Sequence, residues 1–311
     1  INCTLTDADG EEIGIAFTHG ETVAFPVAAP VLWNAEQPYL YTLTLQAGAE
    51  TIEQKVGIRT ISVENGKILI NGKQVKFRGV NRHDSNPYTG AAVTREDVIR
   101  DLQLMKESNV NAIRTSHYPN APYFPELCNE YGFYMIAEAD LESHGVGTLY
   151  TNDGHDCMGY IAQDDAWAES ILDRQKRNVI RDKNQSAVIF WSLGNESGYG
   201  GNFEDAGRWV KAYDPTRLLH YEASIYDSAG YHNDVSMLDV MSRMYADTEW
   251  VKEYCEDRRM RKPFIQCEFI HAMGNGPGDI HDYMELMYKY DKFCGGFVWE
   301  WCDHATWEGK A

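Results

Sequence analysis

The chain has 311 residues, enough for one large domain or for a medium domain and a small one. It carries 28 Lys and Arg against 47 Asp and Glu, a formal net charge of −19, which argues against nucleic acid or an anionic membrane surface as a partner. Apolar residues at 43% and charged residues at 24% are typical of a globular protein, and no apolar run approaches the ~18 residues of a membrane-spanning helix. Disordered, fibrous and membrane-spanning classes are therefore excluded.

Seven cysteines are spread along the chain, and none of them forms a C-x-x-C pair. An odd number at irregular spacing is typical of reduced thiols in a cytoplasmic protein rather than of a disulfide scaffold or a zinc site. The chain opens with Ile1 and has no initiator Met, so the prediction of a cytoplasmic location does not take account of any leader segment.

The first part of the chain has the pattern of antiparallel strands. Between residues 39 and 45, Tyr39, Tyr41, Leu43 and Leu45 alternate with Leu and Thr, a period of two residues. Asn-Gly turns at 65–66 and 71–72 frame a short strand at 68–70 as a hairpin. We therefore predict all or part of a small β-sandwich over residues 1–57 and a second domain over residues 58–311.

From Val75 onward, short apolar runs alternate with helical segments, which predicts an α/β fold. Eight such repeats indicate a parallel (β/α)8 TIM barrel, with an open doubly wound sheet as the alternative. Thr94, placed three residues before Asp97, is expected to cap the first helix. Because only residues 302–311 follow the last strand, we expect the last helix to be missing. The predicted strands are 75–80, 112–116, 134–139, 188–193, 218–221, 238–241, 264–269 and 296–299, and the predicted helices include 94–107, 165–181 and 279–290.

Polar residues gather at the C-terminal ends of seven of the eight predicted strands. In a parallel barrel these ends meet at one mouth, where catalytic groups lie. A single polar strand end is an ordinary solvated loop, but seven together favour a functional site, because gathering charges in one mouth carries a desolvation cost. The polar runs are 81–84, 114–117, 138–144, 195–197, 244–245, 268–271 and 299–301.

Glu196 and Glu268 are the predicted catalytic residues. Each directly follows or ends an apolar strand, and strands four and seven lie on different sides of a closed barrel. Two carboxylates across a pocket suit glycosidic bond cleavage, in which one protonates the leaving oxygen and the other attacks the anomeric carbon or activates water.

Three further patterns are weaker. Trp299, Trp301 and Tyr245 at strand ends suit either sugar binding or core packing. Glu142-x-His144, which Glu196 would complete, suits a metal ion, although a histidine at this spacing is more often structural. The glycine-rich residues 274–278 lack the spacing of a phosphate-binding loop, so we do not predict nucleotide binding.

The order of the motifs resembles that of the β-galactosidases of glycoside hydrolase family 2. The resemblance covers residues 30–304, and GNESG and CEFIHAMGN are its most specific parts. After Val56-Gly57-Ile58-Arg59 the motifs are NGKQVKFRGVNRHD (71–84), AIRTSHYPN (112–120), EADLESHG (138–145), VIFWSLGNESGYG (188–200), CEFIHAMGN (267–275) and GGFVWEW (295–301).

This resemblance implies a retaining glycoside hydrolase that cleaves terminal β-D-galactosyl residues from β-galactosides such as lactose. Glu196 is implied as acid/base and Glu268 as nucleophile, and Glu142, His144 and Glu196 as ligands of Mg²⁺. Arg114 is implied to support Glu268. Residues implied to contact the galactosyl group or the nucleophile are His83, His117, Asn195, Tyr245, His271 and Trp299.

The family's domain order implies that residues 1–57 belong to an immunoglobulin-like sandwich and that residues 58–311 form most of the catalytic barrel. The family's first domain and the residues after its barrel help to build the substrate pocket and a Na⁺ site. Neither is in this sequence, so we expect Na⁺ only in a longer protein and expect the 311-residue chain alone to be weakly active or inactive. Homo-oligomerisation of the longer protein is left open.

Other functions remain open at this point. β-Glucuronidase and β-mannosidase of the same family share the two carboxylates, and the galactosidase interpretation depends on the histidine-rich loops and on residues 271–275. More remote alternatives are a metal-dependent hydrolase built on His83, His117, Glu142 and His144, and a catalytically silent carbohydrate-binding protein.

Overall fold

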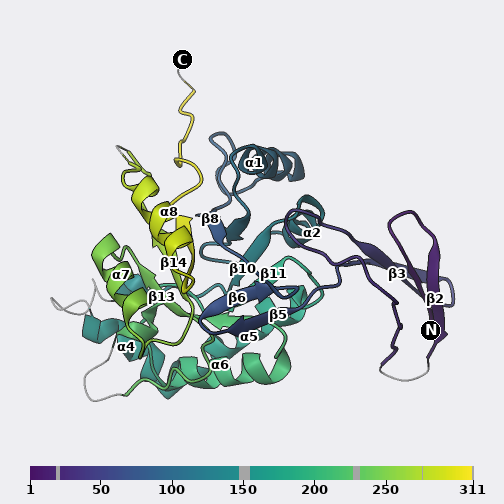
Figure 1. The fold of residues 1–311 in the computed structure, drawn as a ribbon, viewed down its shortest axis with the longest axis horizontal. Coiled ribbons are helices and arrows are strands. Elements are labelled where there is room, and N and C mark those ends of the chain that lie inside the picture. Colours follow the sequence, from purple (N-terminus) through teal and green to yellow (C-terminus); the bar gives the residue numbers. More distant parts are fainter. Residues whose placement is uncertain (19–21, 147–154, 227–231, 275, 310–311) are drawn as a thin grey trace.

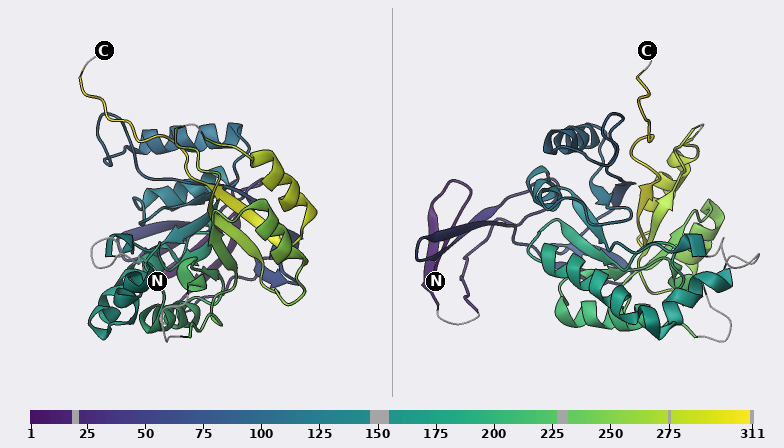
Figure 2. Two further views of the ribbon diagram at one scale, coloured as in Figure 1. Left: turned by 90° about the vertical axis from the view of Figure 1, so that its left-hand side faces the viewer. Right: turned by 180° about the vertical axis from the view of Figure 1, so that it is seen from behind.

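The computed structural model describes residues 1–18, 22–146, 155–226, 232–274 and 276–309. Eight parallel strands form a nearly closed barrel that is surrounded by helices, and a small antiparallel sheet projects to one side (Figures 1 and 2). The predicted (β/α)8 TIM barrel is confirmed. The open doubly wound sheet is wrong, because β8 pairs with β15 and so joins the first barrel strand to the last.

The barrel strands are hydrogen-bonded in the order β12-β11-β10-β9-β8-β15-β14-β13. Among the described residues no ladder joins β12 to β13, and a backbone hydrogen bond from Asp239 N to Leu219 O, at 3.0 Å, lies at that junction. The strands are β8 (Phe77–Asn81), β9 (Ala112–Arg114), β10 (Tyr134–Glu138), β11 (Val188–Ser192), β12 (Leu218–His220), β13 (Met241–Met244), β14 (Phe264–Phe269) and β15 (Phe293–Val298).

Two strand predictions were misplaced. The sixth strand was predicted at 238–241, but Leu238 and Val240 are buried in a connecting segment, and β13 begins at Met241. Leu238 and Val240 are therefore buried by side-chain packing and do not belong to a strand ladder. The eighth strand begins three residues earlier than predicted, at Phe293, and so includes Gly295 as well as Gly296.

The helices cover the outside of the barrel (Figure 1). Thr94 caps α1 as predicted, and the helix predicted over 165–181 is a 3-10 turn at Asp165–Trp167 followed by α5. None of the helices within the described residues has the length and apolar character needed to cross a membrane. The helices are α1 (Arg95–Glu107), α2 (Tyr123–Tyr131), α4 (His155–Gln163), α5 (Ala168–Asp182), α6 (Gly201–Tyr213), α7 (Thr248–Glu256) and α8 (Ile280–Lys289).

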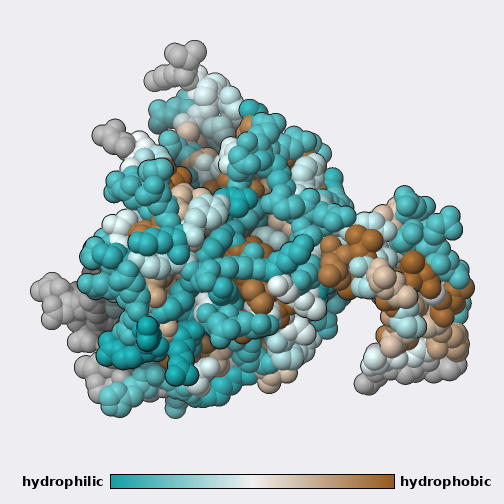
Figure 3. Space-filling model, in the orientation of Figure 1, coloured by the Kyte–Doolittle hydropathy of each residue, from teal (hydrophilic) through white to brown (hydrophobic). Residues whose placement is uncertain are grey.

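Two antiparallel sheets precede the barrel. The projecting sheet has the order β2-β1-β3-β4, and the predicted hairpin belongs to a three-stranded sheet, β5-β6-β7, whose Ile68 and Ile70 are buried in the main core. Figure 3 shows apolar surface on the projecting sheet, where Ile15 and Ile52 are exposed. The strands are β1 (Asn2–Thr6), β2 (Glu12–Phe17), β3 (Tyr41–Ala47), β4 (Glu50–Val56), β5 (Ile61–Glu64), β6 (Lys67–Ile70) and β7 (Lys73–Gln74).

Trp33 connects the projecting sheet to the barrel. Its side chain is fully buried in the main core, and its Nε1 donates to Asn129 O at 2.9 Å. Gly57 packs at the same junction, where a Cβ would lie 2.7 Å from both the Trp33 ring and Ser186 Oγ. The close fit explains the need for glycine at this position. The cysteines described with side chains, Cys3, Cys128, Cys255, Cys267, Cys294 and Cys302, are free thiols, and the side chain of Cys157 lies outside the described residues.

Candidate active site

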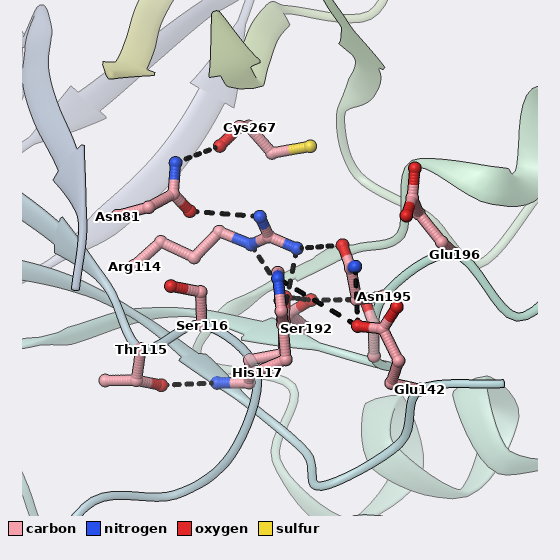
Figure 4. Close-up of polar contacts among 12 residues, drawn as sticks. Asn81, Arg114, Thr115, Ser116, His117, Glu142, Ser192, Asn195, Glu196 and Cys267 are labelled. Carbon is pink, nitrogen blue, oxygen red and sulfur yellow. Dashed lines mark hydrogen bonds and ion pairs between the residues drawn. The ribbon is translucent and has the colours of Figure 1, made fainter. Parts of the chain in front are cut away.

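Arg114, at the end of β9, lies at the centre of a polar network and is fully buried (Figure 4). Its Nε and Nη2 donate to the two oxygens of Glu138 at 2.7 and 3.0 Å, and its Nη1 donates to Glu268 Oε1 at 2.9 Å. Asn81 Oδ1 and Asn195 Oδ1 accept the remaining bonds, at 3.0 and 2.7 Å. Burial acts to lower the pKa of Arg114, but the nearby carboxylates, Glu138 foremost, raise it well above its usual value. A permanent positive charge therefore lies beside Glu268.

Glu138 anchors this network inside the barrel. Burial acts to raise the pKa of its carboxyl, but Arg114 and the hydrogen bonds from His117 and Ser192 lower that pKa to about 2. The carboxylate therefore remains ionised, and it fixes both the guanidinium of Arg114 and the imidazole of His117, whose Nδ1 lies 2.6 Å from Glu138 Oε1.

Glu268 lies near the end of β14 and is only 6% exposed. Arg114 binds its Oε1, and the Tyr245 hydroxyl donates to its Oε2 at 3.0 Å. Burial first, and then the negative charge of Glu268, raise the pKa of Tyr245, so the phenol keeps its proton. One donor on each oxygen fixes the orientation of the Glu268 carboxylate.

Glu196 has a different environment. It lies in the loop after β11 with φ of 34°, and 35% of its side chain is exposed. Its Oε2 lies 2.6 Å from His144 Nδ1, while its backbone N–H donates to Glu222 Oε1 at 3.0 Å. Glu222 is buried, and burial raises its pKa to about 8. Figure 4 shows Glu196 on the far side of Asn195 from Arg114.

Short contacts connect the surroundings of the two predicted catalytic acids. His117 Nε2 lies 3.8 Å from Glu268 Oε1 and 3.9 Å from Glu142 Oε2. Glu142, His144 and Glu196 in turn place one ligand atom each within 4.8 Å of one another. Asn195 bridges the two sides, because its Oδ1 accepts from Arg114 and its Nδ2 donates to Glu142 Oε2 at 2.8 Å. The structure thus brings Glu196 and Glu268 to one mouth of the barrel.

Aromatic rings form one wall of this mouth. Trp299 stacks on His117 with ring centroids 5.3 Å apart and an interplanar angle of 12°. The ring of His83 meets both of them edge to face, at 5.3 Å from His117 and 5.4 Å from Trp299. A stacked pair of this kind presents a flat surface beside the polar residues of the mouth, which suits the apolar face of a sugar ring.

The other predicted residues lie at the margin of the site. His271 is exposed, with its ring centroid 6.4 Å from that of Tyr245. Trp301 is held away from the mouth, because its Nε1 donates to Asp101 Oδ1 at 3.1 Å and its ring packs against the main core. Core packing, one of the two roles suggested by the sequence, therefore describes Trp301.

The sequence pattern did not assign roles to Glu138 and Glu222. Glu138 was visible as an ionisable residue at the end of an apolar strand, and Glu222 as the first carboxyl after the fifth strand. Glu138 lies in one of the polar runs from which Glu196 and Glu268 were selected, whereas the end of the fifth strand was not among those runs. The pattern could not tell that Glu138 pairs with Arg114 or that Glu222 holds the backbone of Glu196, because those contacts depend on the closed barrel.

Two groups within the described residues have the geometry of a metal site. One is the predicted set of Glu142, His144 and Glu196, and the other comprises His83, Glu300 and His304. In each group the ligand atoms all lie within 4.8 Å of one another. The second set was missed because His304 follows the last strand and came after all of the motifs considered.

Two models of one protein family match this chain. Residues 61–310 match the family model described as "Glycosyl hydrolases family 2, TIM barrel domain", and residues 4–59 match the model "Glycosyl hydrolases family 2". A β-galactosidase of Actinobacillus pleuropneumoniae is 50% identical over 300 residues, which cover 90% of this chain and 30% of that protein. A β-galactosidase of Staphylococcus xylosus is 47% identical, over 98% of this chain and 31% of its own length.

The fold matches solved structures as well. A β-glucuronidase of Faecalibacterium prausnitzii superposes with a TM-score of 0.77 at 25% identity, over 99% of this chain and 56% of that one. A β-glucuronidase of Ruminococcus gnavus with uronic isofagomine gives a TM-score of 0.78 at 22% identity, over 99% of this chain and 58% of that one, which shows a shared fold.

The chain spans about 30% of the length of the curated relatives that it matches. The match to the barrel model nevertheless covers most residues of this chain, and it includes every residue of the mouth described above. On that ground this chain belongs to family 2 of the glycosyl hydrolases.

Proposed function

We propose that this chain carries the catalytic barrel of a retaining β-galactosidase. The observation that carries the proposal is the contrast between the two acids at one mouth. Glu268 is buried and held on both oxygens by Arg114 and Tyr245, whereas Glu196 is one-third exposed, with one carboxylate oxygen beside the exposed His144 and its backbone N–H bound to Glu222. A fixed, ionised carboxylate suits a nucleophile, and an accessible one suits a group that exchanges protons.

In the first step, Glu268 attacks the anomeric carbon, the glycosidic C–O bond breaks, and Glu196 gives its proton to the departing oxygen. In the second step, Glu196 takes a proton from water as that water attacks the same carbon, and the bond to Glu268 breaks. Arg114 and Tyr245 hold the Glu268 oxygens so that attack follows one direction. Because Glu138 fixes His117 Nδ1, the Nε2 of His117 is left to face the sugar.

The galactoside substrate is supported by the relatives named β-galactosidase, which are 37–50% identical to this chain. The β-glucuronidase structures share less sequence, at 21–25% identity. A glucuronide also needs a partner for its carboxylate, and Arg114 already donates five hydrogen bonds to four residues. Glucuronide and mannoside cleavage are therefore the alternatives that a substrate panel must exclude.

We propose Mg²⁺ at Glu142, His144 and Glu196. Two carboxylates and one imidazole suit a hard divalent cation that keeps several waters, and the exposed side chains leave room for those waters. When bound, the ion would supply positive charge beside Glu196. Equilibrium dialysis should show one Mg²⁺ lost from His144→Gln, and unchanged stoichiometry would contradict the assignment.

The sheet β2-β1-β3-β4 is proposed to be part of an immunoglobulin-like sandwich. Its alternating burial and the family match over residues 4–59 support this assignment. A crystal structure of the full-length protein would test it by showing whether a second antiparallel sheet packs on the face that carries Leu5 and Leu43.

The catalytic proposal is tested with nitrophenyl glycosides and the full-length protein. Glu268→Gln should lower kcat by at least 10³-fold on every β-galactoside, because no covalent intermediate forms. In Glu196→Gln, the rate of the first step should fall much less when the leaving group is dinitrophenolate than when it is a poorer leaving group, because dinitrophenolate departs without a proton. Glu285→Gln, on the exposed face of α8, is the matched control and should keep full activity.

A 2-deoxy-2-fluoro-galactoside should label Glu268 covalently, with the modified peptide identified by mass spectrometry. Labelling of a different residue, or full turnover by Glu268→Gln, would refute the mechanism. Faster cleavage of a glucuronide or a mannoside than of a galactoside would refute the substrate assignment and leave the mechanism standing.

A further inference from the structure

A second group of ligating side chains lies beside the aromatic wall. His83, which follows β8, and His304, in the segment after β15, both contact the same oxygen of Glu300. His83 Nδ1 lies 2.8 Å and His304 Nε2 lies 3.2 Å from Glu300 Oε2. The two rings are nearly perpendicular, with centroids 5.2 Å apart. Two segments more than 200 residues apart in sequence therefore converge on one carboxylate.

The surroundings of Glu300 resemble those of a metal-ligating carboxylate. Its side chain is only 3% exposed, and the ion pairs that the structure gives it are those with the two imidazoles, neither of which carries a permanent charge. A buried carboxylate without a fixed cation is costly, and a divalent ion would offset that cost. His304 is 41% exposed, so water can reach the cluster from its side.

We propose that His83, Glu300 and His304 form a Zn²⁺ site with three protein ligands and one open position. Two imidazole nitrogens and one carboxylate oxygen are a common donor set for zinc, and the ligand atoms already lie within 4.8 Å of one another. The donor set of Glu142, His144 and Glu196 differs, because it has two carboxylates and a single imidazole and so favours a harder ion. The two clusters therefore select different metals.

Zinc at this position would affect sugar binding. The His83 ring touches Trp299 and His117 edge to face, so an ion on His83 lies at the edge of the mouth. Zinc should then raise KM for the sugar more than it lowers kcat. This consequence depends on the proposed function, whereas metal binding itself does not.

The binding test uses the full-length protein with Mg²⁺ in excess, and Zn²⁺ is titrated by calorimetry. His304→Gln should lose one zinc equivalent or bind it at least tenfold more weakly, while His281→Gln, on the exposed side of α8, should bind like the unmodified protein. A His144→Gln background removes a ligand from the other cluster, so the remaining equivalent belongs to His83, Glu300 and His304. Equal zinc binding by the His144→Gln protein with and without His304→Gln would overturn the proposal.

Two further measurements guard against a folding artefact. His304→Cys supplies another zinc ligand and should restore binding that His304→Gln loses. Co²⁺ in place of Zn²⁺ should give the intense visible absorption of a four-coordinate site, which His304→Gln abolishes; weak six-coordinate bands in the His144→Gln background would overturn the assignment. Zinc binding without any effect on KM would uphold the site and would count against sugar binding at this mouth.

Discussion

At the scale of single residues, His220 shows how the barrel interior controls protonation. Its Nδ1 lies 3.0 Å from Ser192 Oγ and its Nε2 lies 2.8 Å from Ser242 Oγ. Because the Ser192 hydroxyl donates to Glu138, its oxygen is free to accept a hydrogen bond from Nδ1–H of His220. The Nε2 of His220 is then left to accept a hydrogen bond from the Ser242 hydroxyl. Burial first, and then the charge of Arg114, lower the pKa of His220 from 6.5 to about 3. The imidazole is therefore neutral in the folded protein.

This shift predicts a loss of stability in mild acid. Between pH 6.5 and about 3 the unfolded chain binds a proton that the folded chain excludes, so the contribution of His220 is fully present above pH 6.5 and falls as pH decreases. The slope for one proton is about 1.4 kcal/mol per pH unit. Urea unfolding at pH 7, 6 and 5 should show the difference in free energy of unfolding between the unmodified protein and His220→Gln shrinking at that rate below pH 6.5.

The exposed His281 provides the control for this experiment. The difference in free energy of unfolding between His281→Gln and the unmodified protein should stay constant with pH, because the ring of His281 lies on the surface of α8 beside Glu285. A difference between the unmodified protein and His220→Gln that stays constant with pH would show that the buried imidazole does not set the acid sensitivity.

The positions of Glu196 and Glu268 were predictable, because a carboxylate that ends or follows an apolar barrel strand must lie near the mouth. Their environments were not. The left-handed backbone of Glu196 and its bond to Glu222 depend on a residue 26 positions away, and Glu268 meets Arg114 across the barrel. Strand periodicity gives the face on which a side chain lies but not its partner on another strand.

At the scale of elements, the N-terminal cap of α1 was predicted correctly from the sequence. Thr94 Oγ1 accepts from Asp97 N at 3.1 Å, and Asp97 Oδ2 accepts from Thr94 N at 2.9 Å, which together start α1. The backbone and side-chain bonds from Thr94 also lower the pKa of Asp97. The reciprocal pair is local in sequence, so it can be predicted without the tertiary fold.

Thr94→Ala should therefore destabilise the protein by about 1 kcal/mol, the usual contribution of an N-cap. Urea unfolding measures the change, and Gln103→Ala, on the exposed face of the same helix, should leave stability within about 0.5 kcal/mol of the original. Equal effects of the two substitutions would mean that the cap does not stabilise α1.

The misplaced sixth strand shows a limit of prediction from local sequence. Leu238 and Val240 have the apolar character of a strand, but the carboxylate of Asp239 between them accepts from Leu219 N, at 2.7 Å, in the middle of β12. The apolar neighbours of Asp239 are buried for packing rather than for ladder formation. Hydrophobicity predicts burial directly and predicts the type of element only through its period.

At the scale of the whole molecule, Trp33 holds the projecting sheet to the barrel. Its ring is completely buried, it meets Tyr134 edge to face at 5.9 Å, and it donates to the backbone of α2 at Asn129. Arg59 strengthens the junction by donating to the backbone oxygens of Ser186 and Val188. The sequence indicated a domain boundary near residue 57, but it did not indicate that Trp33, from the first domain, would be buried in the core of the second.

Trp33→Ala should cost about 3–5 kcal/mol, because it opens a cavity at this junction. Thermal unfolding measures the loss. The matched control is Trp307→Ala, whose ring is 56% exposed and whose removal should change stability by less than about 1 kcal/mol. A similar loss from both substitutions would show that the junction does not depend on the buried ring.

In the part of the chain that the structure describes, β12 and β13 are not joined by a ladder, and this gap in strand pairing lies between the two acids. Glu196 follows β11 and Glu268 ends β14, so the short way round from one to the other crosses this seam. Along the long way round, continuous hydrogen-bonded strands and the guanidinium of Arg114 connect their surroundings. At the seam itself, the backbone bond from Asp239 N to Leu219 O and the contact of His220 Nε2 with Ser242 Oγ take the place of a ladder. The separation of the two carboxyl groups is therefore set by paired strands along the long way round and by single contacts along the short way.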